Sequence, residues 1–187
     1  MKERPILFNG RMVRAILDGV KTVTRRPIKP EPLMVTEHGT ARWAGAPEDL
    51  QRLLEQNGRK CPYGEPGDRL WVREAWARTL VAQAPGEEWV VYRDGDNRTD
   101  YGGPWKPSIH MRRCDSRILL EITAVRVEPL QHITIGQICR EGLARSIYEF
   151  IPVTTAFDVF ADLWNSTGGD WDANPWVWVV EFKRVTP

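Results

Sequence analysis

The chain has 187 residues, of which 42% are hydrophobic and 27% charged, and its formal net charge is only +1. This composition is that of an ordinary globular protein, and so balanced a charge gives no overall field to attract nucleic acid or another polyanion. The length suits one domain, and no stretch has the apolar length of a signal peptide or a membrane-spanning helix. We therefore expect a cytoplasmic protein with a single domain over residues 1–187.

The first third of the chain predicts a strand, a helix and a long insertion. Residues 5–8 are a short apolar run typical of a strand, and residues 11–18 place apolar side chains at helical spacing before Gly19 ends the helix. Residues 30–67 are rich in proline, glycine and charge, which indicates an insertion between regular elements. Within it, residues 47–57 predict a short surface helix, because leucines recur at helical spacing after an acidic start.

The remainder alternates strand patterns with short helices. Large β-forming side chains recur in four segments, at residues 69–76, 88–93, 117–127 and 176–182. Helical spacing recurs at 135–141 and 155–165, and a polar segment at 94–107 predicts a second insertion. The last strand is apolar on both faces, so we expect it at the centre of a sheet with Val177 and Val179 buried. Together these elements indicate an α+β domain built on a small closed or nearly closed barrel.

Cysteine and histidine are sparse and scattered. Cys61, Cys114 and Cys139 have no C-x-x-C spacing, which predicts reduced thiols rather than a disulfide framework or a zinc ribbon. No two of the three histidines have the spacing of a local metal site. We expect no metal and no organic cofactor, although a metal site assembled from distant parts of the chain stays open.

The segment GVKTVTRR, residues 19–26, raises the main functional question. In a regular strand Lys21 and Thr24 would lie on opposite faces, because side chains alternate with period two. If the two act together, the backbone between them must turn, and Gly19 at the end of the predicted helix permits such a departure. An exposed basic strand is the alternative and stays open at this point.

Gly19, Lys21, Thr24 and Arg26 fit the pattern G-x-K-x-x-[ET]-x-R, and through it the chain resembles the ASCH domain family, a relative of the PUA-type RNA-binding barrel. The segments CPYGEPGDRLWVREAW, PSIHM and NPWVWVVEF are also similar to longer ASCH proteins encoded by phages and prophages. The resemblance covers nearly the whole chain. It implies a PUA-like small mixed β-barrel with short flanking helices and insertions at about 30–67 and 94–107.

The same resemblance implies an activity. ASCH proteins that hydrolyse N4-acetylcytidine to cytidine and acetate similarly pair a motif lysine and threonine with a glutamate on a later strand, and Glu74 would be the matching glutamate here. Thr24 is then the nucleophile, Lys21 its general base and Glu74 the acid that protonates the departing nitrogen. Since a carboxylate favours the charged form of a neighbouring lysine, the two groups must titrate as a coupled pair.

Five further residues are candidates for substrate binding. Arg26, or backbone amides near Gly19, would hold the developing oxyanion. Trp76 lies in the same predicted strand as the glutamate and would stack on a pyrimidine ring. His110 and Arg117 would contact ribose or phosphate. A purely structural role stays open for each of them, and the glutamate has the alternative of a surface salt bridge.

Two other functions compete with the amidohydrolase. Residues 11–29 carry six basic side chains against Asp18 alone, which would suit an RNA-binding module without catalysis. An ASCH ribonuclease is the third reading, although the chain lacks a paired-histidine or acidic-cluster signature. The predicted partner is therefore a small-molecule nucleoside, with RNA as the alternative and no membrane.

Overall fold

The computed structural model describes residues 1–81, 84–94 and 101–186. Its helices are α1 (Gly10–Leu17), α2 (Pro47–Gln56), α3 (Ile135–Arg140) and α4 (Thr155–Ser166), with 3-10 turns η1 (Ser108–His110), η2 (Arg113–Asp115), η3 (Leu130–His132) and η4 (Ile147–Glu149). Its strands are β1 (Glu3–Leu7), β2 (Val23–Pro27), β3 (Leu33–Thr36), β4 (Gly39–Arg42), β5 (Arg69–Arg73), β6 (Trp76–Val81), β7 (Ala84–Tyr92), β8 (Leu119–Pro129) and β9 (Trp176–Val185).

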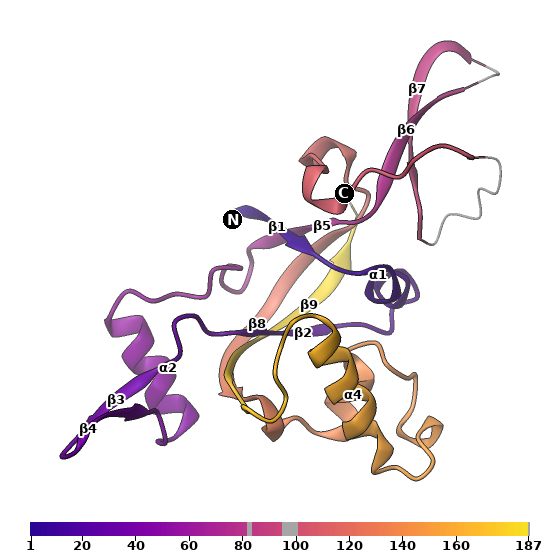
Figure 1. The fold of residues 1–187 in the computed structure, drawn as a ribbon. Coiled ribbons are helices and arrows are strands. Elements are labelled where there is room, and N and C mark those ends of the chain that lie inside the picture. The colour runs from indigo at the N-terminus through magenta and orange to yellow at the C-terminus, as the bar shows by residue number, and fades with distance from the viewer. Residues whose placement is uncertain (82–83, 95–100, 187) are drawn as a thin grey trace.

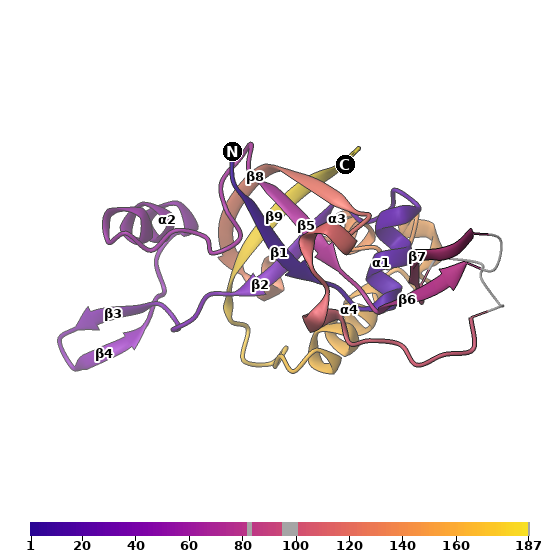
Figure 2. The same ribbon diagram turned by 90° about the horizontal axis from the view of Figure 1, so that it is seen from above.

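A five-stranded mixed sheet forms the centre of the molecule, with strand order β1-β5-β8-β9-β2. β1 and β5 run parallel, and the other neighbouring strands are antiparallel. Two separate hairpins, β3–β4 and β6–β7, extend from opposite ends of this sheet (Figures 1 and 2). The predicted α+β class is confirmed.

The sheet curls so that its two edge strands meet. Arg26 of β2 donates a 2.7 Å hydrogen bond from Nη2 to the carbonyl oxygen of Leu7, the last residue of β1. These two strands stand at opposite ends of the strand order, so only a curled sheet brings them into contact. No backbone ladder joins them among the described residues, and the barrel is therefore nearly closed rather than closed.

Helix α1 confirms the predicted helix at 11–18 and lies one residue earlier at both ends. Asn9 is the N-cap, and its Oδ1 accepts a hydrogen bond from the backbone N–H of Met12 at 2.9 Å. The buried face carries Val13 and Ile16 into the main core. Gly19 follows the helix with a φ of 73°, a conformation that favours glycine because it has no Cβ.

Strand β9 lies in the interior of the sheet and not at its edge, as we predicted. It pairs with β8 on one side and β2 on the other, and Val177 and Val179 are both 0% exposed. Trp178, Val180 and Phe182 face the core that includes α1 and α2, whereas the two valines face the core under α3 and α4. A strand buried on both faces explains its continuous apolar sequence.

Replacing Phe182 by alanine should therefore destabilise the protein by about 3–5 kcal/mol, because the cavity left in a central strand cannot collapse fully. The free energy of unfolding in guanidinium chloride measures this. The matched control is Lys183→Ala on the same strand, which removes only an exposed ion pair with Glu121 and should cost less than about 1 kcal/mol. Equal losses for the two variants would contradict the central position.

The insertion at 30–67 packs on the main core instead of standing apart from it. The predicted helix there is α2, whose Leu50 and Leu54 are buried in the same cluster as the sheet. The insertion also contains the β3–β4 hairpin, which the sequence did not predict. It is tied to β9 by a 3.0 Å hydrogen bond from Trp176 Nε1 to the carbonyl of Trp43. Of the second predicted insertion, residues 95–100 lie outside the described residues.

One predicted strand, residues 69–76, is wrong in its extent. β5 ends at Arg73, and Trp76 begins β6, which belongs to a different two-stranded sheet. The break means that strand alternation does not carry from Val72 through Glu74 to Trp76. None of the described helices is both long enough and apolar enough to cross a lipid bilayer.

Candidate active site

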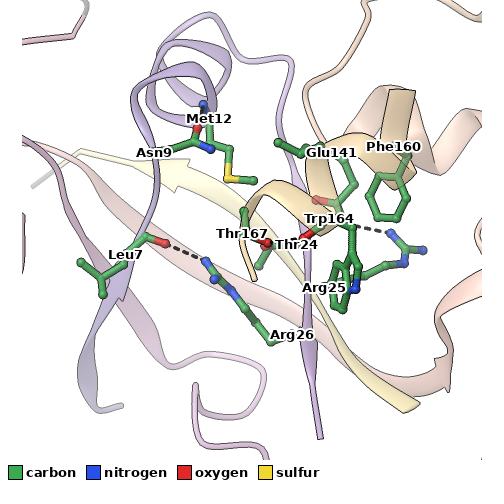
Figure 3. Close-up of a pocket in the computed structure, with 11 residues that line it drawn as sticks. Leu7, Asn9, Met12, Thr24, Arg25, Arg26, Glu141, Phe160, Trp164 and Thr167 are labelled. Carbon is green, nitrogen blue, oxygen red and sulfur yellow. Dashed lines mark hydrogen bonds and ion pairs between the residues drawn. The ribbon is translucent and has the colours of Figure 1, made fainter. Parts of the chain in front are cut away.

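A small cavity of about 90 Å³ lies where β2, the start of α1 and helix α4 come together (Figure 3). Thr24 lines it from β2, where its backbone pairs with Val180 of the central strand. The Thr24 side chain is almost completely enclosed, at 2% exposure, and its hydroxyl has no hydrogen-bond partner among the described residues. A buried hydroxyl that borders a cavity and is left unpaired is available to a ligand.

Lys21 is equally buried, and its amine is surrounded by acceptors. Nζ donates to the carbonyl oxygen of Val23 at 2.8 Å, to the carbonyl oxygen of Glu141 at 2.9 Å and to Glu141 Oε2 at 2.7 Å. Lys21 precedes β2, so its side chain folds back along its own chain to reach Val23. This local turn explains how a lysine that precedes the strand carrying Thr24 is buried as deeply as the threonine.

The carboxylate that meets Lys21 is therefore Glu141, the C-cap residue of α3. The next residue, Gly142, has a φ of 90°, and a Cβ there would lie 2.6 Å from Ala15 Cβ and 3.0 Å from Lys21 Cβ. Only glycine allows α3 to end so close to the lysine. The sequence analysis did not single out Glu141, although a glutamate followed by glycine at the end of a predicted helix is a usable signal.

Arg25 holds the Glu141 carboxylate from its other side. Its Nη1 donates to Glu141 Oε1 at 3.0 Å, and its Nη2 donates to Glu128 Oε1 at 2.6 Å and to Gln137 Oε1 at 3.0 Å. Lys21 and Arg25 are thus balanced by two carboxylates in a buried network. Such a network is tolerated because each charge is paired and hydrogen-bonded. The contacts from Lys21 and from Arg25 Nη1 restrict where the carboxylate of Glu141 can point.

Burial lowers the pKa of Lys21 below its ordinary 10.5, because removing the amine from water penalises its charged form. The positive charges of Arg26 and Arg25 lower the pKa further, as we expected for this basic segment. Glu141 opposes the shift by stabilising the ammonium, but the net direction is downward. The amine is therefore easier to deprotonate than that of an exposed lysine.

Arg26 lines the same cavity at the seam between the two edge strands (Figure 3). Its guanidinium lies 5.3 Å from the ring centre of Phe8 and 5.9 Å from that of Tyr63, a residue that the insertion supplies. Nε is buried without a hydrogen-bond partner among the described residues. Arg26 is the cationic side chain of this cavity that has no carboxylate partner in the described part of the chain.

Gly19 takes a structural role. Its N–H donates to the carbonyl of Ile16 at 3.1 Å, and the N–H groups of Val20 and Lys21 both donate to the carbonyl of Ala15 at 2.9 Å. These amides close the C-terminus of α1. They are already occupied, so they do not provide the oxyanion-binding amides that we considered from the sequence.

Glu74 lies in a different set of contacts. Both of its carboxylate oxygens accept hydrogen bonds from Arg117, at 3.0 and 2.9 Å, and it is only 1% exposed. Arg117 also stacks on the ring of Tyr92, 4.1 Å from its centre, and donates to the carbonyl of Asp94. Two of the predicted site residues thus pair with each other, where β5 ends and the β6–β7 hairpin begins.

The remaining two candidates also lie elsewhere. Trp76 is buried in a cluster with Trp71, Met111 and Leu119, as expected of a core aromatic residue. His110 is exposed on η1. The aromatic wall of the cavity comes instead from Phe160 and Trp164 of α4, which the sequence analysis assigned only to a helix face (Figure 3). Across 1–81, 84–94 and 101–186, no group of three His, Cys, Asp or Glu side chains could hold a metal ion.

The chain was compared with family models, curated proteins and solved structures, and one solved structure is similar to it. A scan against protein-family models and a search of curated proteins found no match. A crystal structure of an ASCH domain from Lactobacillus crispatus JV V101 is similar to this chain, with a TM-score of 0.42 and 14% sequence identity. The alignment covers 100% of this chain and 81% of that one. A similarity of this size does not establish a family.

Proposed function

We propose that the protein is an amidohydrolase that removes the acyl group from N4-acetylcytidine or a related N4-acylated cytosine nucleoside. The observation that carries the proposal is that Thr24 and Glu141 line one small cavity, where the Thr24 hydroxyl is unpaired and Glu141 forms a 2.7 Å ion pair with the buried Lys21 behind it. A nucleophile, a base and an acid are the groups that acyl transfer needs. The choice of N4-acylcytosine follows from the resemblance of GVKTVTRR to the ASCH motif.

The catalytic residues in this proposal are Thr24, Lys21 and Glu141. Glu141 takes the role that we first gave to Glu74, because it is the carboxylate in contact with the lysine and also lines the cavity. Glu74 accepts hydrogen bonds from two nitrogens, Nε and Nη2, of a different side chain, Arg117.

Lys21 must be neutral to act as a base. In the structure its three hydrogen bonds are those of an ammonium group, with every proton directed at an acceptor. Moving one proton along the 2.7 Å contact to Glu141 gives a neutral amine and a neutral carboxylic acid. The transfer leaves the net charge of the buried network unchanged, and the desolvation of Lys21 favours it.

Acyl transfer then proceeds in two balanced halves. The Thr24 oxygen bonds to the acyl carbon as Lys21 takes the hydroxyl proton, and the C–N bond breaks as Glu141 gives its proton to the departing exocyclic nitrogen. The pair again holds one proton. That proton passes from Lys21 to Glu141, and in the second half the neutral Lys21 takes a proton from water, which attacks the Thr24 ester, while Glu141 returns a proton to the threonine oxygen. The products are cytidine and the carboxylic acid.

Arg26 is the group we assign to the oxyanion. It lines the cavity, and its guanidinium is not neutralised by a described carboxylate, so its charge is available to the developing negative charge. The aromatic rings of Phe8 and Tyr63 restrict its position. With so small a cavity, we place the acyl group and the edge of the pyrimidine inside it and the sugar at its mouth.

Incubation of the purified protein with N4-acetylcytidine, followed by chromatographic measurement of cytidine release, tests the proposal directly. Release that depends on the protein concentration supports it. If the parent protein releases no cytidine but binds RNA with a steep salt dependence, the RNA-binding module becomes the better function.

The structure weakens that alternative in one respect. Of the six basic side chains in residues 11–29, three are already engaged by carboxylates: Arg14 by Asp94, Lys21 by Glu141, and Arg25 by Glu128 and Glu141. Charges neutralised within the protein contribute little to the release of counterions from a nucleic acid. The predicted basic surface is therefore about half as charged as the sequence indicates.

The pH dependence of kcat/KM should have an alkaline limb below pH 10.5. The reactive form holds one proton on the Lys21–Glu141 pair, and the pair loses that proton as the pH rises through the lowered pKa of Lys21. Activity should therefore be constant near neutral pH and then fall. Initial rates between about pH 6 and pH 10, corrected for spontaneous hydrolysis, measure the limb. Activity that rises across the whole range would show that Lys21 must first lose its proton to solvent, contrary to this mechanism.

A further inference from the structure

We infer that Asn9 determines specificity in the proposed reaction, by donating a hydrogen bond from its side-chain NH₂ group to an acceptor on the pyrimidine ring. The inference rests on the proposed function, because it names what the same cavity recognises. Cytosine offers two acceptors next to its N4 position, the N3 and O2 atoms. Asn9 donates a hydrogen bond to one of these two atoms.

The orientation of the Asn9 amide follows from its place in the fold. As N-cap of α1 it must present an acceptor to the helix, and Oδ1 takes the N–H of Met12 at 2.9 Å. This contact decides which end of the amide is oxygen, because an NH₂ group cannot accept that hydrogen bond. The NH₂ group is thereby directed away from the helix, and it has no partner among the described residues.

Asn9 and Met12 both line the cavity that holds Thr24, and Figure 3 shows them side by side at the start of α1. Two independent features therefore point to a ligand here. One is the hydroxyl of the buried Thr24, which has no partner among the described residues, and the other is the NH₂ group of the exposed Asn9, a donor that helix capping fixes in orientation at the cavity mouth. A ligand that spans them needs a carbonyl carbon at one end and a hydrogen-bond acceptor at the other.

An N4-acylated cytosine meets this requirement. Its acyl carbon reaches Thr24, and N3 and O2 follow along the same edge of the ring without an N–H group between them. A uracil ring has an N3–H donor on this edge, which would face the NH₂ group of Asn9 unfavourably. Helix capping holds the NH₂ group of Asn9 in place as a donor. A cytosine ring gives this donor an acceptor, whereas a ring with a donor at the same position leaves the NH₂ group unpaired or facing another donor.

Asn9→Asp and Asn9→Ser separate recognition from capping. Both replacements are good N-caps, so α1 and the melting temperature should be preserved. The serine variant removes the NH₂ donor and should raise KM for N4-acetylcytidine roughly tenfold. The aspartate variant places a carboxylate oxygen opposite an acceptor of the ring, so the two acceptors repel each other and KM should rise further. The rate kcat should change much less than KM. If Asn9 only caps the helix, both variants will keep the KM of the parent protein, and that result would overturn the inference.

A binding measurement keeps this test independent of catalysis. Isothermal titration of cytidine and uridine into the parent protein should show tighter binding of cytidine, and Asn9→Asp should remove the preference. Absence of cytidine release by the parent would reject the proposed activity, while the titration would still decide the role of Asn9. Equal affinity of the parent for cytidine and uridine would overturn it.

Discussion

Thr24→Val should abolish the hydrolysis of N4-acetylcytidine while leaving the fold intact. Valine keeps the shape of the side chain and suits a buried strand, and the Thr24 hydroxyl makes no hydrogen bond to the described protein that its removal would break. Loss of the nucleophile removes the covalent route altogether, so turnover should fall by at least about 10³-fold. Steady-state rates together with thermal unfolding of both proteins measure the effect.

Thr24→Ser is the matched control, because it restores a hydroxyl at the same position. It should retain measurable activity, reduced by the greater rotational freedom of serine at χ1. Mass spectrometry of rapidly quenched parent protein should detect an acyl group on Thr24, which the valine variant cannot form. A valine variant as fast as the parent would show that Thr24 is not the nucleophile.

Glu141→Gln should lower kcat by about 10²-fold or more. Glutamine has nearly the shape of glutamate and can still accept a hydrogen bond from Lys21, but it can neither take the lysine proton nor donate one to the leaving nitrogen. It also leaves the buried charge of Lys21 without its closest counterion. Removing one partner of a buried ion pair costs about 3–5 kcal/mol, so the free energy of unfolding at neutral pH should fall as well.

Glu74→Gln distinguishes this loss of stability from the loss of chemistry. It disturbs another ion pair of a buried carboxylate, that of Glu74 with the partly exposed Arg117, and should also lower the free energy of unfolding. Its kcat, measured below the unfolding temperature, should fall less than tenfold. If Glu74→Gln inactivates the protein and Glu141→Gln does not, the acid is Glu74, as first inferred from the motif resemblance, and the pair at Lys21 is structural.

Much of the fold follows from short stretches of sequence. Helices α1 and α2 are visible in the spacing of their apolar residues, and β9 is visible as a run that is apolar on both faces. These features are local, because helix and strand periodicity repeat within a few residues. Lys21, Thr24 and Arg26 are likewise found from one eight-residue segment, since the turn that buries the lysine is built by its immediate neighbours.

Which carboxylate pairs with Lys21 of this segment was decided only by the tertiary structure. Lys21 and Glu141 are 120 positions apart, and no local pattern indicates which of many glutamates comes to the lysine. Glu74 was chosen from the motif resemblance, and strand alternation then placed Trp76 beside it, but β5 ends one residue before Glu74 and the chain enters another hairpin. What brings Glu141 into place is the close approach of α3 to α1, which the absence of a side chain at Gly142 allows. Contacts of this kind depend on how whole elements pack, and the sequence around either residue does not say which distant residue it will meet.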